Sequence, residues 1–284
     1  MKIGLLVSFS ANTAGPADLA RFMESVGFES IWAPEHPAFP VEIKSPWPGG
    51  GPVPAYYGQT VDPFVALAMA AAATTRLKLG TGVCLVVEHN PIVLAKETAT
   101  LDAFSGGRFI LGIGAGWLRE EAELLGVDFA HRWAQTAEFV AAIRELWRKP
   151  EASFDGKYVK FPPLRSYPRP AQPSGPPVHI GSVGRNVLSR VARWADGWCP
   201  IRATPEFVAG RMPSLREECR AVGRDPGAIE ITVMNAIASE RARARDELAR
   251  FAEAGVHRFV ARHDGDLSRA GYQRELERLA ALVL

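Results

Sequence analysis

Two adjacent residues, Glu35 and His36, place a carboxylate beside an imidazole directly after an apolar segment at 30–33. Barrel enzymes keep their catalytic groups at the C-terminal ends of strands, and histidine exchanges protons near neutral pH. Adjacent residues at a strand end point in different directions, so one would face a bound ring and the other a substrate. We therefore predict Glu35 and His36 as catalytic, with a nearby carboxylate holding the imidazole tautomer. The alternative is a histidine that makes only structural hydrogen bonds.

Three short apolar segments, at 79–83, 108–116 and 177–184, break into small residues at their C-terminal ends. Continuous apolar runs of this length indicate strands that are buried on both faces, as in a parallel sheet. Ligands bind at the carboxyl ends of such strands, where small residues would let a flat ring approach the backbone. The predicted cofactor shelf comprises Thr81, Gly82, Val83, Gly114 and Gly181. The alternative is a set of ordinary glycine-containing strand ends.

A predicted anion site follows the last of these segments. Ser182, Val183 and Gly184 precede a helical pattern at 186–194, with Arg185 beside them. Free amides at a helix N-terminus attract anions, and an arginine adds positive charge. A flavin mononucleotide or the side chain of a deazaflavin would supply the phosphate. The alternative is a glycine turn next to a solvated arginine.

These candidate residues require a scaffold of alternating strands and helices, which the sequence contains. Strands are predicted at 3–7, 30–33, 77–81, 109–113, 178–181, 197–201, 229–234 and 258–261, separated by helical patterns. Eight such units favour a closed α/β (β/α)8 TIM barrel, as a single domain over 1–284, with an open doubly wound sheet as the alternative.

Two insertions interrupt the alternation. Residues 37–62 are rich in proline and glycine and carry Trp47, Tyr56 and Tyr57. The second insertion follows a helix at 133–147 and reads as a hairpin at 153–158 with an Asp-Gly turn, then a proline-rich stretch at 162–177. Long loops in compact domains are usually lids or binding loops, so both are expected over the C-terminal end of the barrel.

Composition and spacing exclude several other classes of function. Lys and Arg number 33 against 31 acidic residues with no basic stripe, so nucleic acid is not an expected partner. The first residues run into a strand without a signal pattern, and the longest apolar tract, 61–75, is too short to cross a membrane. A cytoplasmic location is therefore expected. No GxSxG elbow or Walker loop supports a hydrolase or an NTPase.

No metal site is predicted. The three cysteines, Cys84, Cys199 and Cys219, form no CxxC pair, which argues against both a disulfide framework and a zinc site. The other histidines show no HxxH or HExxH spacing. They are His89, His131, His179, His257 and His263.

An ordered set of motifs resembles the bacterial luciferase-like monooxygenase superfamily. The segments are WAPEH at 32–36, DPF at 62–64, LGTGV at 79–83, ATLD at 99–102 with SGGR at 105–108, GIGAGW at 112–117 and ADGW at 195–198. Within the superfamily the likeness is to the branch of oxidoreductases that use coenzyme F420, a deazaflavin. The resemblance implies a barrel that holds a deazaflavin or FMN at its C-terminal face, often as a homodimer. It also implies a non-proline cis peptide at Gly82-Val83 and adds Trp117 to the cofactor-binding residues.

One departure from this branch bears on the substrate. The related sugar-phosphate dehydrogenases carry a glutamate where this chain has Trp117, so Glu120 or Glu121 would have to replace it. With Trp47 and the tyrosines near the mouth, a small apolar or aromatic organic substrate is expected. Three functions remain open: hydride transfer with F420, oxygenation with reduced FMN from a separate reductase, and flavin binding without catalysis. The intact Glu35-His36 pair and glycine rim count against the third.

Overall fold

A closed parallel barrel forms the centre of the computed structural model, which describes residues 1–262 and 267–284. The hydrogen-bonded strand order is β3-β2-β1-β11-β10-β9-β8-β5-β4, and an additional β3–β5 pairing closes the ring. The strands are β1 (Lys2–Leu6), β2 (Ser30–Ala33), β3 (Lys78–Thr81), β4 (Cys84–Leu85), β5 (Phe109–Gly114), β8 (Val178–Ile180), β9 (Gly197–Trp198), β10 (Glu230–Ala236) and β11 (Arg258–Arg262). Because β4 continues β3 beyond a break, the ring has the eight strand positions that the sequence predicts, and the TIM barrel is confirmed.

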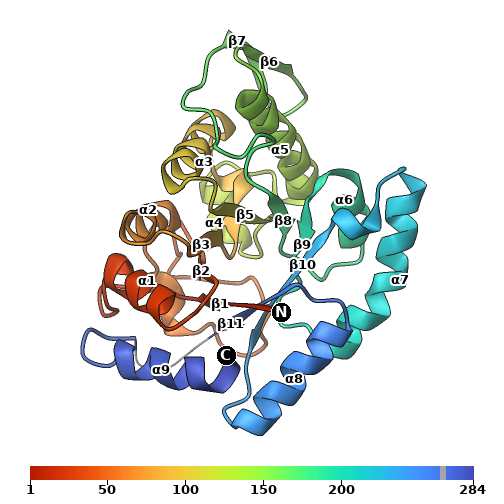
Figure 1. Cartoon of the computed structure of the whole chain (residues 1–284). Coiled ribbons are helices and arrows are strands. Elements are labelled where there is room, and N and C mark those ends of the chain that lie inside the picture. The colour runs from red at the N-terminus through yellow and green to blue at the C-terminus, as the bar shows by residue number, and fades with distance from the viewer. Residues whose placement is uncertain (263–266) are drawn as a thin grey trace.

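Helices surround this ring on the outside (Figure 1). They are α1 (Pro16–Ser25), α2 (Pro63–Ala73), α3 (Pro91–Ser105), α4 (Arg119–Leu124), α5 (Arg132–Arg148), α6 (Val187–Trp194), α7 (Pro205–Ala221), α8 (Arg241–Glu253) and α9 (Tyr272–Val283). Local sequence explains their starts, because a capping side chain followed by proline opens several of them. Asp62 accepts a hydrogen bond from Val65 N at 2.8 Å before α2, and Asn90 accepts one from Ile92 N at 2.9 Å before α3. Within the described ranges no helix is long and apolar enough to cross a membrane.

The barrel interior is filled by the ring of Trp32. Its Nε1 donates to Ser30 Oγ at 2.9 Å, and a Cβ on Gly80 would lie 2.3 Å from its Cε3. Ile110, Cys199, Met234 and Val260 pack around it. The glycines inside these strands therefore provide room for a large side chain, as expected for a packed barrel core.

Gly112 on β5 is expected to tolerate no side chain. A Cβ there would lie 2.1 Å from the backbone oxygen of Thr81 on β3, so the two strands that close the barrel would have to separate. Gly112→Ala should lower the free energy of unfolding by about 2 kcal/mol, as overpacking typically does. Urea unfolding would measure it. Gly210→Ala in α7 is the control, because a Cβ there meets nothing within 4 Å. Equal midpoints for Gly112→Ala and wild type would contradict this packing.

The first insertion, between β2 and α2, lies over the C-terminal end of the barrel, as predicted. It includes a short 3-10 helix, η1 (Ala55–Gln59). Two residues at the C-terminal ends of barrel strands hold it there. Arg262 donates to Tyr56 Oη at 2.9 Å, and the Arg202 guanidinium lies 4.5 Å from the centre of the Trp47 ring. The insertion therefore covers the end of the barrel at which the candidate residues meet.

The second insertion was expected at the same end, and this expectation is wrong. It joins α5 to β8, and a connection from a helix to the next strand lies at the N-terminal end of a barrel. Gln172 accordingly bonds to Asp102 near the end of α3 and donates to Phe109 O at the start of β5, at 2.9 Å. The hairpin β6 (Ala152–Asp155) and β7 (Lys160–Leu164) is present, but Gly156 N donates to Val159 O, so its turn lies at Lys157 and Tyr158 and not at Asp155-Gly156.

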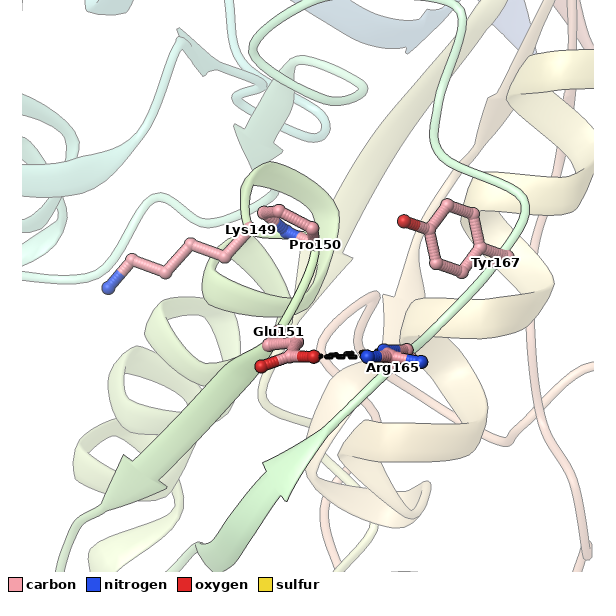
Figure 2. Close-up of a pocket in the computed structure, with 5 residues that line it drawn as sticks. All are labelled: Lys149, Pro150, Glu151, Arg165 and Tyr167. Carbon is pink, nitrogen blue, oxygen red and sulfur yellow. Dashed lines mark hydrogen bonds and ion pairs between the residues drawn. The ribbon is translucent and has the colours of Figure 1, made fainter.

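A shallow hollow lies beside this hairpin (Figure 2). It is lined by Lys149, Pro150, Glu151, Arg165 and Tyr167, with Arg165 Nε donating to Glu151 at 3.0 Å. None of the predicted site residues lines it. The hollow is thus separate from the candidate active site.

Candidate functional site

His36 is held by a carboxylate from a distant part of the sequence. Its Nδ1 lies 2.7 Å from Oε2 of Glu121 in α4, and Oε1 of Glu121 accepts from Ala38 N at 3.2 Å. An ionised carboxylate only accepts, so Nδ1 carries the hydrogen and Nε2 keeps its lone pair. Among the described residues, Nε2 has no hydrogen-bond partner. His36 is therefore oriented to accept a proton from a substrate, as a general base requires.

Aromatic rings enclose this histidine. The ring centres of Phe39, Tyr57 and Trp117 lie 5.4, 5.2 and 6.0 Å from that of His36, whose side chain is only 7% exposed. Tyr57 comes from the first insertion and Trp117 follows β5, so these two of the aromatic residues predicted near the mouth contact His36. Sequence reasoning did not single out Phe39. The rings cover most of the imidazole and surround it with apolar side chains.

The neighbouring acid, Glu120, has a different task. It accepts from Lys44 N at 2.8 Å and from both Ser45 N and Ser45 Oγ, which fixes the first insertion to α4. The hydrogen bond from the Ser45 hydroxyl is the main reason that the pKa of Glu120 falls to about 2. Of the two acids proposed to replace the missing glutamate, Glu121 is the one that meets His36, and it acts by orienting the imidazole.

Glu35 lies beside the break between β3 and β4 and does not bond to His36. Its Oε2 accepts from Leu85 N at 2.6 Å, and its Oε1 lies 2.9 Å from His89 Nε2. Burial opposes the charged imidazole, but the hydrogen bond and charge of Glu35 outweigh it and raise the pKa of His89. With both oxygens engaged, Glu35 has the contacts of a residue that positions this turn; a direct catalytic role stays a prediction.

The same turn brings together three groups that could bind a metal. One ligand atom each of Glu35, Cys84 and His89 lies within 4.8 Å of the others, a convergence that spacing could not reveal. Burial, followed by the charge of Glu35, raises the pKa of the Cys84 thiol well above its usual value. A metal binds the thiolate form of cysteine, which the raised pKa of Cys84 disfavours, and Glu35 already accepts two hydrogen bonds. We therefore interpret Glu35, Cys84 and His89 as a hydrogen-bonded cluster.

The remaining histidines each have their own surroundings. His131 pairs with Asp128 on the surface, and His257 Nδ1 accepts from Ile231 N at 3.0 Å. Burial lowers the pKa of His179 to about 4, so it is neutral. His263 lies outside the described residues.

The predicted shelf forms around a cis peptide at Gly82-Val83, as the family resemblance implies. The Val83 side chain lies between two glycines: a Cβ on Gly114 or Gly181 would come within 2.8 or 2.4 Å of its methyl groups. Thr81 Oγ1 is buried and donates to Gly112 O at 2.7 Å. These glycines therefore make room for Val83, whereas the sequence suggested that they leave the backbone open. The surface that remains for a ring is Val83 and its bulge.

The predicted anion site is exposed and precedes α6. Ser182 O is fixed by Trp198 Nε1 at 2.9 Å, and Ser182 Oγ accepts from Gly184 N at 3.1 Å. Val183, Gly184 and Arg185 are exposed, and no side chain caps the start of α6 at Asn186. Val187 N donates to Gly184 O at 3.1 Å, so the next amides of α6, those of Leu188 and Ser189, are left for water or an anion. The segment therefore fits a phosphate.

Glu88, at the end of the 3-10 turn η2 (Val86–Glu88), is a residue that sequence reasoning missed. Both its carboxyl oxygens are buried and bond to no described residue. The pKa of Glu88 is raised to about 9, mainly because the carboxyl is buried and further because the charges of Glu121 and Glu35 lie near it. The signal available in the sequence was a lone acid in an apolar run, LVVEH at 85–89.

This burial makes stability depend on pH. The unfolded chain loses the Glu88 proton near pH 4.5, but the folded chain keeps it until about pH 9, so the stability that the proton contributes is lost as pH rises between these values. Glu88→Gln removes the dependence. Its free energy of unfolding relative to wild type should rise by about 4 kcal/mol between pH 5 and pH 8. Urea unfolding at both pH values measures this, with Glu253→Gln on the surface of α8 as control. A constant difference would mean that Glu88 is ionised in the folded protein.

Comparison of the sequence with known proteins identifies a family and several relatives. The model of the luciferase-like monooxygenase family matches residues 4–281. An uncharacterised protein of Mycobacterium tuberculosis is 40% identical over 262 residues, which cover 90% of this chain and 89% of that protein. An F420-dependent glucose-6-phosphate dehydrogenase of Kineococcus radiotolerans is 32% identical over 240 residues, 82% of this chain and 66% of that enzyme.

Solved structures extend the likeness to the fold. An F420-dependent secondary alcohol dehydrogenase in complex with an F420-acetone adduct superimposes with a TM-score of 0.78 at 20% identity, over 99% of this chain and 98% of that one. The barrel is therefore matched along nearly its whole length. The chain belongs to the luciferase-like monooxygenase family.

Proposed function

We propose that the protein is an F420-dependent oxidoreductase that transfers hydride between C5 of the deazaflavin and a small organic substrate. The observation that carries the proposal is the His36–Glu121 pair, 2.7 Å apart, enclosed by aromatic rings at the C-terminal end of the barrel. The F420-dependent dehydrogenase among the relatives supports the choice of cofactor. A bound deazaflavin supplies the hydride acceptor or donor.

The residues present fit such a cofactor. Val83 and its bulge would support one face of the ring, and Ser182, Val183 and Gly184 with the free amides near the start of α6 would hold the phosphate. Arg185 is exposed beside these amides and adds a positive charge.

His36 supplies the proton transfer that accompanies hydride movement. In oxidation of an alcohol, Nε2 takes the hydroxyl proton; in reduction of a carbonyl, it returns one. Glu121 stabilises the imidazolium that forms and keeps the ring in the required tautomer, as a buried carboxylate does in other acid-base pairs.

The substrate is proposed to be apolar or aromatic. Phe39, Tyr57 and Trp117 face His36, and Trp47 packs on Tyr57 with ring centres 6.0 Å apart. The resemblance to the F420-dependent sugar-phosphate dehydrogenases implies that Trp117 stands where those enzymes carry a glutamate. An apolar wall suits a hydrocarbon or aryl group better than a sugar phosphate.

A second candidate is a monooxygenase that uses reduced FMN from a separate reductase, which the family name favours. Two assays with one panel of primary and secondary alcohols separate the candidates: bleaching of F420, and oxygen uptake with reduced FMN. We expect F420 reduction by apolar alcohols and no substrate-dependent oxygen uptake. Oxygen uptake would favour the monooxygenase, and neither response would favour a barrel without catalysis.

We further propose a homodimer built on α2 and α3. α2 carries no charged side chain, yet Val65 is 63% and Met69 46% exposed; on α3, Phe104 is 84% exposed. Exposed apolar side chains gathered on two packed helices mark an interface, and a second copy offers the same surface.

Met69→Lys should therefore convert the dimer to a monomer in light scattering after gel filtration, because a buried lysine at the interface would lack a partner. Val222→Lys, on an apolar side chain of similar exposure after α7, is the control and should leave the mass unchanged. A wild-type monomer, or a dimer that survives Met69→Lys, would refute this interface.

A further inference from the structure

Three arginine side chains, which we call the arginine cluster, gather at the start of α5. The guanidinium carbons of Arg119 and Arg132 lie 4.6 and 3.9 Å from the centre of the Phe129 ring. The next residue of α5, Trp133, places its ring centre 4.6 Å from the guanidinium carbon of Arg190 in α6. Two aromatic rings therefore hold the three arginines as neighbours, through cation–π contacts that also fix their orientation.

The arginine cluster lies at the C-terminal end of the barrel. In a barrel of this kind each helix runs back toward the N-terminal ends of the strands, so the first residues of α5 and α6 lie at the end that holds the candidate site. Arg132 is the first residue of α5, and Arg190 N bonds to Asn186 O, one turn into α6. The cluster therefore begins one helical turn beyond the predicted anion site at 182–184 and extends from there to α4.

Most of this positive charge has no acid beside it. Arg119 pairs with Glu123 at 3.0 Å. In the part of the chain that the structure describes, Arg132 and Arg190 pair with no carboxylate, and the only hydrogen bond of the Arg132 guanidinium is from Nη1 to Phe129 O at 2.7 Å. Burial, and then the charge of Arg132, lowers the pKa of Arg190. Guanidinium groups that are held together without acids favour anionic ligands, above all carboxylates and phosphates, which they bind through paired hydrogen bonds.

A phosphate alone does not account for this charge. The diester phosphate in a deazaflavin side chain carries a single negative charge, and the anion site with the exposed Arg185 already provides for it. Arg132 and Arg190 add positive charge one helical turn away. The side chain of F420 continues beyond its phosphate into γ-linked glutamates, whereas the side chain of FMN ends at its phosphate. The charge beyond the anion site therefore matches the carboxylates of F420 and has no counterpart in FMN.

We propose that the arginine cluster binds the carboxylates of the glutamate tail of F420 and so makes the protein prefer F420 to FMN. This inference rests on the proposed F420-dependent function and adds to it the residues that select the cofactor. Arg132 and Arg190, which have no acid partner among the described residues, make the contact with the tail. Phe129 and Trp133 hold their guanidinium groups in place before the cofactor arrives, which lowers the entropic cost of binding.

Titration of the purified protein with two forms of the cofactor tests the proposal through binding alone. F420 with its glutamate tail should bind about 10-fold more tightly than the same cofactor without glutamates, as a few exposed ion pairs would provide. In the double variant Arg132→Gln/Arg190→Gln the two forms should bind equally, and FMN binding should not change. Arg245→Gln, on the exposed surface of α8, is the control and should keep the 10-fold difference. At about 1 M salt the difference should shrink in wild type, because these charges are screened.

Single variants separate the charge of the cluster from its packing. Arg132→Lys keeps the charge but loses the planar contact with Phe129, so it should retain part of the preference for the tail. Arg190→Gln leaves α5 unchanged and should lose part of that preference. Equal affinities of the two cofactor forms in wild type, or a preference that survives the double variant, would overturn the proposal while F420 binding itself supports the oxidoreductase function.

Arginine NMR identifies the residues that meet the tail. In protein with 15N-labelled arginine, the side-chain signals of Arg132 and Arg190 should shift when F420 with its tail is added, and should shift much less with the tailless form. The signal of Arg245 should stay in place in both titrations. Equal shifts with the two forms would mean that these arginines bind the phosphate, and would overturn the proposal. A protein that binds neither form would refute the F420-dependent function and this inference together.

Discussion

Replacing His36 with alanine is expected to lower turnover by about 100-fold to 10,000-fold, the range for groups that transfer a proton in the transition state. The affinity for F420 should change much less, because the anion loop at 182–184 and the bulge at Val83 remain. The loss should appear in turnover and in kcat/KM alike, since the proton moves in the chemical step. The pH dependence of the wild-type rate that arises from this imidazole should disappear.

Two further variants separate proton transfer from simple disruption. Glu121→Gln keeps the shape of the partner but removes its charge, so turnover should fall at constant cofactor affinity. His131→Ala removes an exposed histidine that pairs with Asp128 on the surface and should leave the rate unchanged. A His36→Ala enzyme with wild-type turnover would remove the histidine from the mechanism and leave a site that only orients its reactants.

Gly184→Asp is expected to weaken F420 binding at least about 100-fold. The substitution places a carboxylate at the entrance to α6, where the free amides and Arg185 would otherwise meet the phosphate, and like charges there repel at close range. Equilibrium titration that follows deazaflavin fluorescence measures the change. Raising the salt concentration should reduce the difference, because this site is exposed.

A neutral variant of the same shape distinguishes charge from size. Gly184→Asn should bind F420 much more tightly than Gly184→Asp. Ser182→Ala should cost only about 1 kcal/mol, because Ser182 Oγ accepts a single hydrogen bond from Gly184 N and the amides remain. Equal affinities of Gly184→Asp and wild type would place the phosphate elsewhere.

The barrel could be predicted because short apolar runs alternate with helical patterns along the chain, and β1, β2 and β11 appear within a residue or two of the predicted ranges. The position of the second insertion could not be predicted from its proline content. Its place between a helix and the next strand, which the predicted order of elements already contained, fixes it at the N-terminal end of the barrel, and the contacts of Gln172 with Asp102 and Phe109 agree with this.

The candidate site was predictable in its residue types but not in its pairings. Glu35 and His36 are neighbours in the chain, yet Glu35 bonds to His89, and the partner of His36 is Glu121, 85 residues away. Spacing along the chain carries no signal for such a contact. For the glycines, the sequence indicated the positions but not their role. Gly114 and Gly181 were predicted to line the cofactor shelf, but only the structure shows that Val83 fills the space they leave.

The central claim, that this barrel holds a deazaflavin, is tested most directly by titrating the purified protein with F420 and, separately, with FMN. We expect saturable binding of F420, which Gly184→Asp weakens, and much weaker binding of oxidised or reduced FMN. Saturable FMN binding without measurable F420 binding would contradict it and would assign the His36 site to flavin chemistry.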